Sequence, residues 1–382
     1  MALTTVQTNN KLIKFTQEIN REYVRENLFS PYMGAGMSAI IRIRQELKSG
    51  GEQMNIPLVA ALNANAVASG TLAGNEENID NYGMRVWLDW ARNAVKTNKA
   101  EKQKDSAAIF DVARPLLGDW GKSLQRDEIV DAFYALPSES APANLGTSAG
   151  QRVNGILLDS STAAQRNTWV VDNVDRVVFG AAVSNYSATF ATGLGNLDTT
   201  ADKFTYTNLD LLKRKAKKAS PKIRPFVLQD GREYFVAFAG TNCFRDLVAS
   251  LATIDGSSRP REQAGPYGAP KNPIFQDGDR IYNGVIVREV PEIDTRSPAV
   301  YATAGNGSVK VSPVWLCGQS AMAFAWGQMA KPTSLDNTDY QFNTGVGIEM
   351  AYGVSKMFKK TTGGLLKEWG IATGFYTSVD DA

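Results

Sequence analysis

Residues 53–91 read QMNIPLVAALNANAVASGTLAGNEENIDNYGMRVWLDWA, and this stretch decides the fold. Two runs in it alternate between apolar and other side chains with a period of two, which is typical of amphipathic β-strands. Their shared faces carry Met54, Ile56, Leu58, Ala60 and Leu62 in the first run, and Tyr82, Met84, Val86, Leu88 and Trp90 in the second. The polar residues 63–81 join them. Since structureless connections beyond about 12–15 residues are uncommon in compact domains, we predict a ribbon whose loop reaches another copy of the chain.

The predicted ribbon needs cover from elsewhere, because a two-stranded hairpin alone is only marginally stable in water. The first run spans residues 53–62. At about 3.3 Å per residue it can project on the order of 30 Å. Its apolar face must therefore be covered by the body of the fold or by a neighbouring subunit. We predict the second case, in which a lone copy leaves the ribbon uncovered.

The composition is that of a globular protein. The chain has 382 residues, 43% hydrophobic and 21% charged, which is enough for two or more cores. Its 41 basic and 39 acidic residues nearly cancel, so it lacks the strongly basic character of a dedicated nucleic-acid binder. The first thirty residues mix charged and apolar positions, unlike a signal peptide, and no apolar run reaches membrane-spanning length. We expect a soluble protein of a reducing compartment with no membrane partner.

Cysteine and histidine usage narrows the possible chemistry. Cys243 and Cys317 lie far apart and outside any CxxC pattern, which argues against a disulfide framework and a zinc site. We expect both to be buried thiols. The chain has no histidine, so the commonest general base and metal ligand is missing. We therefore expect no catalytic residue, cofactor or metal, although carboxylate pairs and lysine chemistry stay open.

Helical patterns occur in three places. Residues 105–136 have apolar positions three and four apart, which predicts a long helix with a kink or break at Pro115 and Gly118. A second helix is predicted over 208–219, and a buried alanine-rich helix over 318–330. A short helix is also expected in the polar arm formed by the first thirty residues.

Strand patterns complete the chain. A hairpin is predicted around Asp230-Gly231, since this dipeptide favours a tight turn. Residues 96–104 are expected to be a lysine-rich connector. The predicted strands cover residues 177–179, 226–228, 234–238, 281–290 and 346–354. One long helix with several hairpins predicts an α+β fold.

Two motifs raise the question of catalysis or cofactor binding. Residues 34–39, GAGMSA, match a dinucleotide-binding fingerprint, but no buried strand precedes them and no βαβ pattern surrounds them, so we favour a plain turn. Glu76 and Glu77 are paired carboxylates of the type that glycosidases use, yet neighbours in an extended segment point to opposite sides. We favour a solvated loop tip or a contact between subunits, and a carboxylate-dependent enzyme stays an alternative.

A basic helix is the strongest candidate for binding another molecule. Five cations occupy six consecutive positions: Lys213, Arg214, Lys215, Lys217 and Lys218. They can meet DNA phosphates through a salt-sensitive, sequence-independent attraction. The alternative, which we favour from the pattern alone, is a solvated helix face with lysines near the negative end of the helix dipole.

Five stretches, in this order, resemble the major capsid proteins of tailed bacteriophages, in the branch of enteric podoviruses that carry a virion polymerase. They are LFSPYMGAGMSAIIR (28–42), NIPLVAAL (55–62) with TLAGNEENIDNYGMRVWLDWARNAV (71–95), LDLLKRKAKKASPKIRPFVLQDGREYFVAF (209–238), NPIFQDGDRIYNGVIVREV (272–290) and TDYQFNTGVGIEMAYGVSKMFKK (338–360). The residues between 137 and 200 match least well.

The resemblance implies the tailed-phage capsid fold and its division of the chain. The divisions are an N-terminal arm (1–37), an extended loop with a β-ribbon (38–100), a peripheral domain with a spine helix (101–222), an axial domain (223–340) and a return to the peripheral domain (341–382). It also implies subunit contacts through the extended loop, at Gly70, Thr71, Leu72, Gly74, Asn75, Glu76 and Glu77.

The function that the resemblance implies is structural. It is a shell protein that self-assembles into hexamers and pentamers of an icosahedral head, which encloses double-stranded DNA. Its expected partners are copies of itself, the packaged DNA, and scaffolding, portal and decoration proteins. Its expected place is the virion, after assembly in the host bacterial cytoplasm. An encapsulin-like compartment around protein cargo stays open as an alternative.

Overall fold

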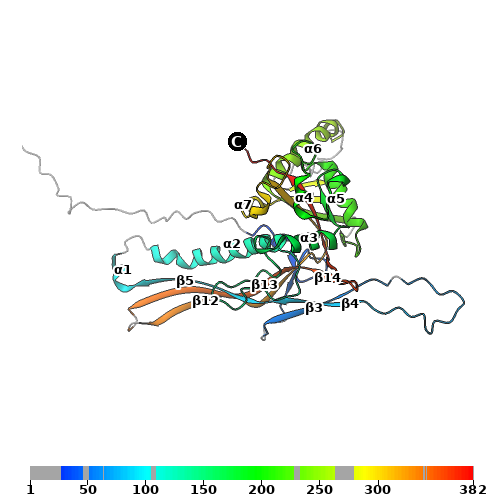
Figure 1. The fold of residues 1–382 in the computed structure, drawn as a ribbon. Coiled ribbons are helices and arrows are strands. Elements are labelled where there is room, and N and C mark those ends of the chain that lie inside the picture. The colour runs from blue at the N-terminus through cyan, green and yellow to red at the C-terminus, as the bar shows by residue number, and fades with distance from the viewer. Residues whose placement is uncertain are drawn as a thin grey trace, which may run out of the picture.

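The chain folds into two layers, seen in a computed structural model that describes residues 27–45, 51–62, 64–104, 109–227, 233–262, 279–338, 340 and 342–381. In Figure 1, α2 (Ala113–Tyr134) lies along an elongated lower sheet, and a second sheet with its helices stands above one part of it. The first 26 residues, and with them the predicted short helix, lie outside the described residues.

The lower sheet contains five strands in the order β1-β2-β12-β13-β5. Its long central hairpin is β12 (Met322–Thr338) with β13 (Asn343–Lys356), which confirms the strand predicted over 346–354. β5 (Asp89–Asn98) pairs antiparallel with β13, and β2 (Ile41–Arg44) pairs parallel with β12. β1 (Met33–Gly34) adds the last, short strand beside β2, after a 3-10 turn at Ser30–Tyr32.

The long helix is confirmed, and it is not broken at Pro115 or Gly118. α2 is continuous from Ala113 to Tyr134 and follows a 3-10 turn at Ile109–Val112. Pro115 is the third residue of the helix, within the first turn, where a backbone N–H has no intrahelical acceptor to lose. The predicted start at residues 105–108 lies outside the described residues.

The alanine-rich helix predicted over 318–330 is also wrong, because these residues lead into and form the first half of β12. Ala323 and Ala325 belong to the small core beneath the ribbon, whereas Phe324 belongs to the main core, where it stacks on Tyr352 with ring centroids 5.1 Å apart. A strand buried on both faces has no polar alternation, and its continuous apolar run is easily mistaken for a buried helix.

The ribbon is confirmed as β3 (Gln53–Val59) paired antiparallel with β4 (Asn81–Trp87). However, its apolar face is not left for another copy. Its buried side chains pack on those of β12 and of the residues after β13, in a core of Met54, Ile56, Leu58, Met84, Val86, Ala323, Ala325, Met357 and Phe358. The prediction of an uncovered ribbon is therefore wrong for its paired part.

The residues after the ribbon also differ from the prediction. β5 extends to Asn98, and α1 (Lys99–Lys104) follows directly. The lysine-rich connector predicted at 96–104 is thus the end of a strand and a short helix, because pairing with β13 continues as far as Asn343↔Asn98.

The upper layer is a seven-stranded sheet in the order β6-β16-β11-β8-β10-β9, with β7 beside β8. The strands are β6 (Val177–Phe179), β7 (Phe226–Val227), β8 (Glu233–Ala239), β9 (Asp279–Tyr282), β10 (Val285–Glu289), β11 (Val311–Cys317) and β16 (Ile371–Thr377). The helices are α3 (Ala163–Asp172), α4 (Phe190–Gly195), α5 (Tyr206–Lys218), α6 (Thr241–Glu262) and α7 (Glu292–Thr295).

Several predictions for this layer hold. The strand at 177–179 and the basic helix are confirmed, and β7 pairs with β8 as the predicted hairpin, whose turn lies outside the described residues. The strand predicted over 281–290 is instead parts of two strands, β9 and β10. They meet at Asn283-Gly284, where both residues have positive φ (44° and 70°), as a tight hairpin turn requires.

The two layers are joined by a small hairpin, β14 (Phe358–Lys360) with β15 (Leu366–Glu368). Chain segments far apart in sequence share each sheet: 177–179 and 371–377 lie in the upper one, and 41–44, 89–98 and 322–356 lie in the lower one. The domain boundaries given by the resemblance stay a prediction.

Candidate assembly surfaces

The loop between β3 and β4 is exposed along almost its whole length, and Figure 1 shows it extending away from both layers. All residues from 70 to 79 are exposed. They include Leu72 and Ile79, with 69% and 64% of their side chains accessible. The seven residues predicted to contact another subunit all lie on this loop, and that role stays a prediction.

Local hydrogen bonds shape the tip of this loop. Gly74 has a φ of +89° and donates its N–H to the Glu76 carboxylate at 2.7 Å. The Asn75 side chain donates to the Thr71 carbonyl at 2.9 Å. Glu77 accepts from the backbone N–H of Ala64 at 2.8 Å, so it bridges the two sides of the loop. The two carboxylates hold the loop's own backbone.

The root of the ribbon is held by charged contacts with β14. The Lys359 ammonium is almost fully buried and forms an ion pair with Asp80, at the point where the loop ends. Lys360 pairs with Glu139 at 2.6 Å, and the Tyr82 hydroxyl donates to the same carboxylate at 3.2 Å. Burial, and then the Glu139 charge, raise the pKa of Tyr82 to about 12. These contacts fix the direction in which the loop leaves the body.

The basic helix α5 is amphipathic, with Leu209, Leu212 and Ala216 fully buried. Two of its five cations are engaged within the chain. Lys213 donates to the Asn283 carbonyl, and burial lowers its pKa. Lys217 pairs with Glu233 at 3.2 Å. The other three, Arg214, Lys215 and Lys218, are exposed or half-buried. Binding of DNA by these residues stays a prediction.

A groove of about 1120 Å³ lies between the ribbon root and the upper layer, and we call it the basic groove. Its walls come from residues 57–61 of the ribbon, 217–225 after α5, and 357–369 around the β14–β15 hairpin. Seven of its lining residues are lysine or arginine and two are aspartate or glutamate. The end of the basic helix therefore lines a cationic concavity.

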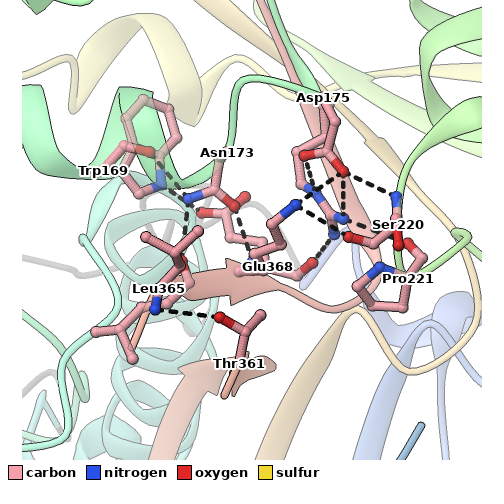
Figure 2. A network of polar contacts seen from close by, with 11 residues as sticks. Trp169, Asn173, Asp175, Ser220, Pro221, Thr361, Leu365 and Glu368 are labelled. Carbon is pink, nitrogen blue, oxygen red and sulfur yellow. Dashed lines mark hydrogen bonds and ion pairs between the residues drawn. The ribbon is translucent and has the colours of Figure 1, made fainter. Parts of the chain in front are cut away.

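A buried polar network ties the upper layer to the lower one (Figure 2). The fully buried Glu368 carboxylate accepts from the Trp169 indole N–H at 3.0 Å and pairs with the Lys356 ammonium. Arg176, also fully buried, donates to the Glu368 carbonyl and pairs with Asp175 at 3.2 Å. Moving one layer against the other would separate these buried ion pairs and leave uncompensated charges, which is costly. The network therefore holds the two layers in one arrangement.

The far end of the lower layer is a second exposed apolar region. Leu335, Tyr340 and Phe342 are exposed at the tip of the β12–β13 hairpin, and Val95 is exposed on the neighbouring β5. Figure 1 places this tip at the end of the lower layer opposite to the β3–β4 loop. The elongated layer thus presents apolar side chains to solvent at both ends.

The described residues give little support to a catalytic function. Among them, no cluster of three or more histidine, cysteine, aspartate or glutamate residues can hold a metal ion. Glu76 and Glu77 lie on the exposed loop, where Glu76 already accepts from the loop backbone. The GAGMSA stretch runs from β1 into bends and turns before β2 and begins no helix, which fits the plain turn. Cys243 and Cys317 are buried and unpaired, as expected.

Sequence reasoning missed the basic groove and the polar network. Both are built from segments that meet only in the folded chain, such as 217–225 and 357–369. A usable signal for the network was present: Lys356, Lys359, Lys367 and Glu368 are charges in or beside apolar strand patterns. Charges in such positions are paired when they are buried.

No helix among the described residues is long and apolar enough to cross a bilayer. A family described as phage capsid protein matches residues 3–375. No curated protein sequence matches the chain.

Solved structures of phage capsids are also similar to this chain. The capsid asymmetric unit of cyanophage Pam1 is 32% identical over 100% of both chains, with a TM-score of 0.85. The capsid of Ralstonia phage GP4 is 16% identical over 100% of both chains, with a TM-score of 0.69. The acidic stable capsid of Helicobacter pylori bacteriophage KHP30 is 11% identical over 97% of this chain and 96% of that one, with a TM-score of 0.64. The last two likenesses concern the fold alone.

Proposed function

The chain belongs to the phage capsid protein family, and from this premise we propose that it builds the hexamers and pentamers of an icosahedral head. It is a major capsid protein with the tailed-phage capsid fold, whose copies associate into the shell of a virion. The resemblance found in its sequence is thereby confirmed. Neither an encapsulin-like compartment nor a carboxylate-dependent enzyme is favoured.

The observation that carries this proposal is the contrast between the held root and the exposed loop. Lys359 and Lys360 fix the ribbon root, while residues 70–79 expose large apolar side chains that the chain itself leaves uncovered. Many such contacts of modest strength sum to a stable shell, since each copy is held at several sites at once. The work of this protein is therefore mechanical.

The enclosed molecule is proposed to be double-stranded DNA, packaged without sequence preference. The nearly balanced charge of 41 basic and 39 acidic residues suits copies packed side by side. Arg214 and Lys215 on α5 are the best candidates to meet phosphates, because neither forms an ion pair within the described part of the chain and neither lines the basic groove. We also propose assembly in the host bacterial cytoplasm, with scaffolding, portal and decoration proteins as partners.

Deletion of residues 70–78 tests this function. The deleted side chains are all exposed, so the variant should stay folded, with the circular dichroism and unfolding midpoint of the unaltered protein. Electron microscopy of the unaltered protein should show closed shells, and the deletion should abolish them. Shells of normal size from the variant, or an unaltered protein that stays a single copy at high concentration, would contradict the proposal.

A further inference from the structure

We propose that the basic groove is the receptor for the β3–β4 loop tip of an adjacent copy. The inference rests on the proposed self-assembly and adds the surface on which the loop docks. Three features carry it: the charge of the loop, the exposed cations of the groove, and the apolar side chains on both.

The loop tip is anionic over a long stretch. Residues 53–84 contain Glu76, Glu77 and Asp80 and no lysine or arginine. Asp80 pairs with Lys359 of its own chain, so the charge that the loop presents to another copy is carried by Glu76 and Glu77, which also accept hydrogen bonds from the loop backbone. Both are exposed on the loop, which extends away from the body (Figure 1).

The groove offers cations that have no acidic partner among the residues that the structure describes. Lys359 and Lys367 pair with Asp80 and Asp175 inside the chain. By contrast, the structure records no acidic partner, among the residues it describes, for three exposed lining cations, Lys218, Lys222 and Arg224. Two carboxylates facing three such cations give electrostatic complementarity, which sets the register of an interface and speeds encounter.

The apolar parts also match. Val59, which is 54% exposed, and the half-buried Trp369 line the groove between its charged residues. Leu72 and Ile79 flank the two glutamates of the loop and are largely exposed in a single copy. Docking of the loop would remove both sets of apolar surface from water, at about 25 cal/mol for each Å² buried.

The geometry of such a contact suits a shell. The loop tip and the groove are different surfaces of one chain, so the contact between copies is head to tail. Contacts of this kind close into rings when the rotation between copies allows it. The groove lies at the root of the next loop, since residues 57–61 form one of its walls. Each docked tip would therefore brace the root of its neighbour's loop.

This assignment gives the cations of the basic helix two different roles. Lys217 and Lys218 line the groove, whereas Arg214 and Lys215 are not among its lining residues. The end of α5 is thus given to contacts between copies. The DNA proposed to lie inside the shell would then be met by Arg214 and Lys215.

Charge reversal tests the receptor. The loop variant is Glu76→Lys/Glu77→Lys, the groove variant is Lys222→Glu/Arg224→Glu, and a third protein carries all four changes. All four side chains are exposed, so folding should survive in each. We expect each double variant to raise the protein concentration needed for shell formation by about tenfold. The fourfold variant should return to within about threefold of the unaltered protein.

The control is Lys99→Glu/Lys102→Glu, which reverses two exposed cations of α1 that do not line the groove and should leave assembly unchanged. If the loop deletion abolishes shells but the fourfold variant does not recover, the receptor is refuted while the proposed function stands. A groove variant that assembles normally yet binds less double-stranded DNA would overturn the inference too, because the groove would then be a DNA site.

Disulfide trapping gives a second readout that does not depend on complete shells. In a chain with Glu76→Cys and Lys222→Cys, mild oxidation should link copies covalently, seen as a ladder on a non-reducing gel. Cys243 and Cys317 are buried and should not interfere. The matched pair Glu76→Cys with Arg214→Cys should give no ladder. Equal ladders from both pairs, or none from either, would contradict the docking of the loop in the groove.

Discussion

The root and the loop of one β-ribbon have opposite environments. In the root, Ile56 and Met84 face each other across the strands and are 2% and 0% exposed, because β12 and the residues after β13 cover them. In the loop, about twelve residues from Met84 towards the tip, Leu72 is 69% exposed. The same hairpin thus contains a part that its own chain stabilises and a part that its own chain leaves bare.

The contrast separates folding from assembly. Burial of the root gives the free subunit a stable, directed arm, so the arm need not fold on its neighbour. Exposure of the loop keeps apolar and acidic side chains available for a partner, as large exposed apolar side chains on a soluble subunit often are. Substitutions in the root should therefore change stability, whereas substitutions in the loop should change only association between copies.

The largest expected effect is on stability, from truncation of the root core. Met84→Ala removes a fully buried side chain and should lower the free energy of unfolding by about 2–5 kcal/mol. The matched loop variant Leu72→Ala should change it by less than about 0.5 kcal/mol. Urea titration of the unassembled protein measures both. Equal losses from the two variants would mean that loop and root are not distinct.

A smaller effect is expected from the acids at the boundary. Asp80→Ala leaves the buried Lys359 ammonium without its partner and should cost about 2–3 kcal/mol. Glu77→Ala, three residues earlier on the exposed loop, should cost less than about 1 kcal/mol. Thermal unfolding of the two variants side by side checks this. If Glu77→Ala were less stable than Asp80→Ala, the part of the ribbon that its own chain stabilises would extend into the loop.

The smallest effect is pH-dependent. The pKa of Tyr82 is raised to about 12 in the folded chain, chiefly by burial, and is about 10 in an unfolded one. The folded state therefore keeps a proton that the unfolded state loses, so this contribution is complete below pH 10 and falls as pH rises towards 12. Solvent screening at this partly buried side chain keeps the change below about 1 kcal/mol.

Tyr82→Phe removes this dependence. The difference in unfolding free energy between the unaltered protein and the variant should shrink between pH 10 and pH 12. Tyr340→Phe, at a fully exposed side chain, is the control. It should leave the change in unfolding free energy between pH 10 and pH 12 as it is in the unaltered protein. A difference that grows with pH would mean that burial and Glu139 do not act on Tyr82 as described.

The sequence predicted the ribbon well because period-two alternation survives wherever one face is covered, as the alternating burial of Gln53–Val59 shows. It failed at β12, where both faces are buried and Met322–Trp326 gives no alternation to read. It also missed the turn at Asn283-Gly284, although that dipeptide is a strong hairpin signal. What covers the ribbon could not be predicted, because the cover comes from residues some 240 to 300 positions further along the chain.

The long loop was predicted from sequence, since the polar, glycine-containing connection was too long for a compact domain. The contact of its seven named residues with another subunit was implied by the resemblance and stays a prediction. The groove was not predicted, because its cations come from α5, from the connection after it and from the β14–β15 hairpin. In sequence they look like separate surface charges. Only the fold places Lys218 and Lys222 on the same concavity as Lys359.

Amide hydrogen exchange, measured on the unassembled subunit and on the closed shell, tests the division between root and loop most directly. We predict slow exchange for β3 and β4 in both states, because their pairing and cover belong to one chain. Residues 60–80 should exchange fast in the free subunit and slowly in the shell. Fast exchange of β3 and β4 until assembly, or a loop unchanged by assembly, would contradict the account.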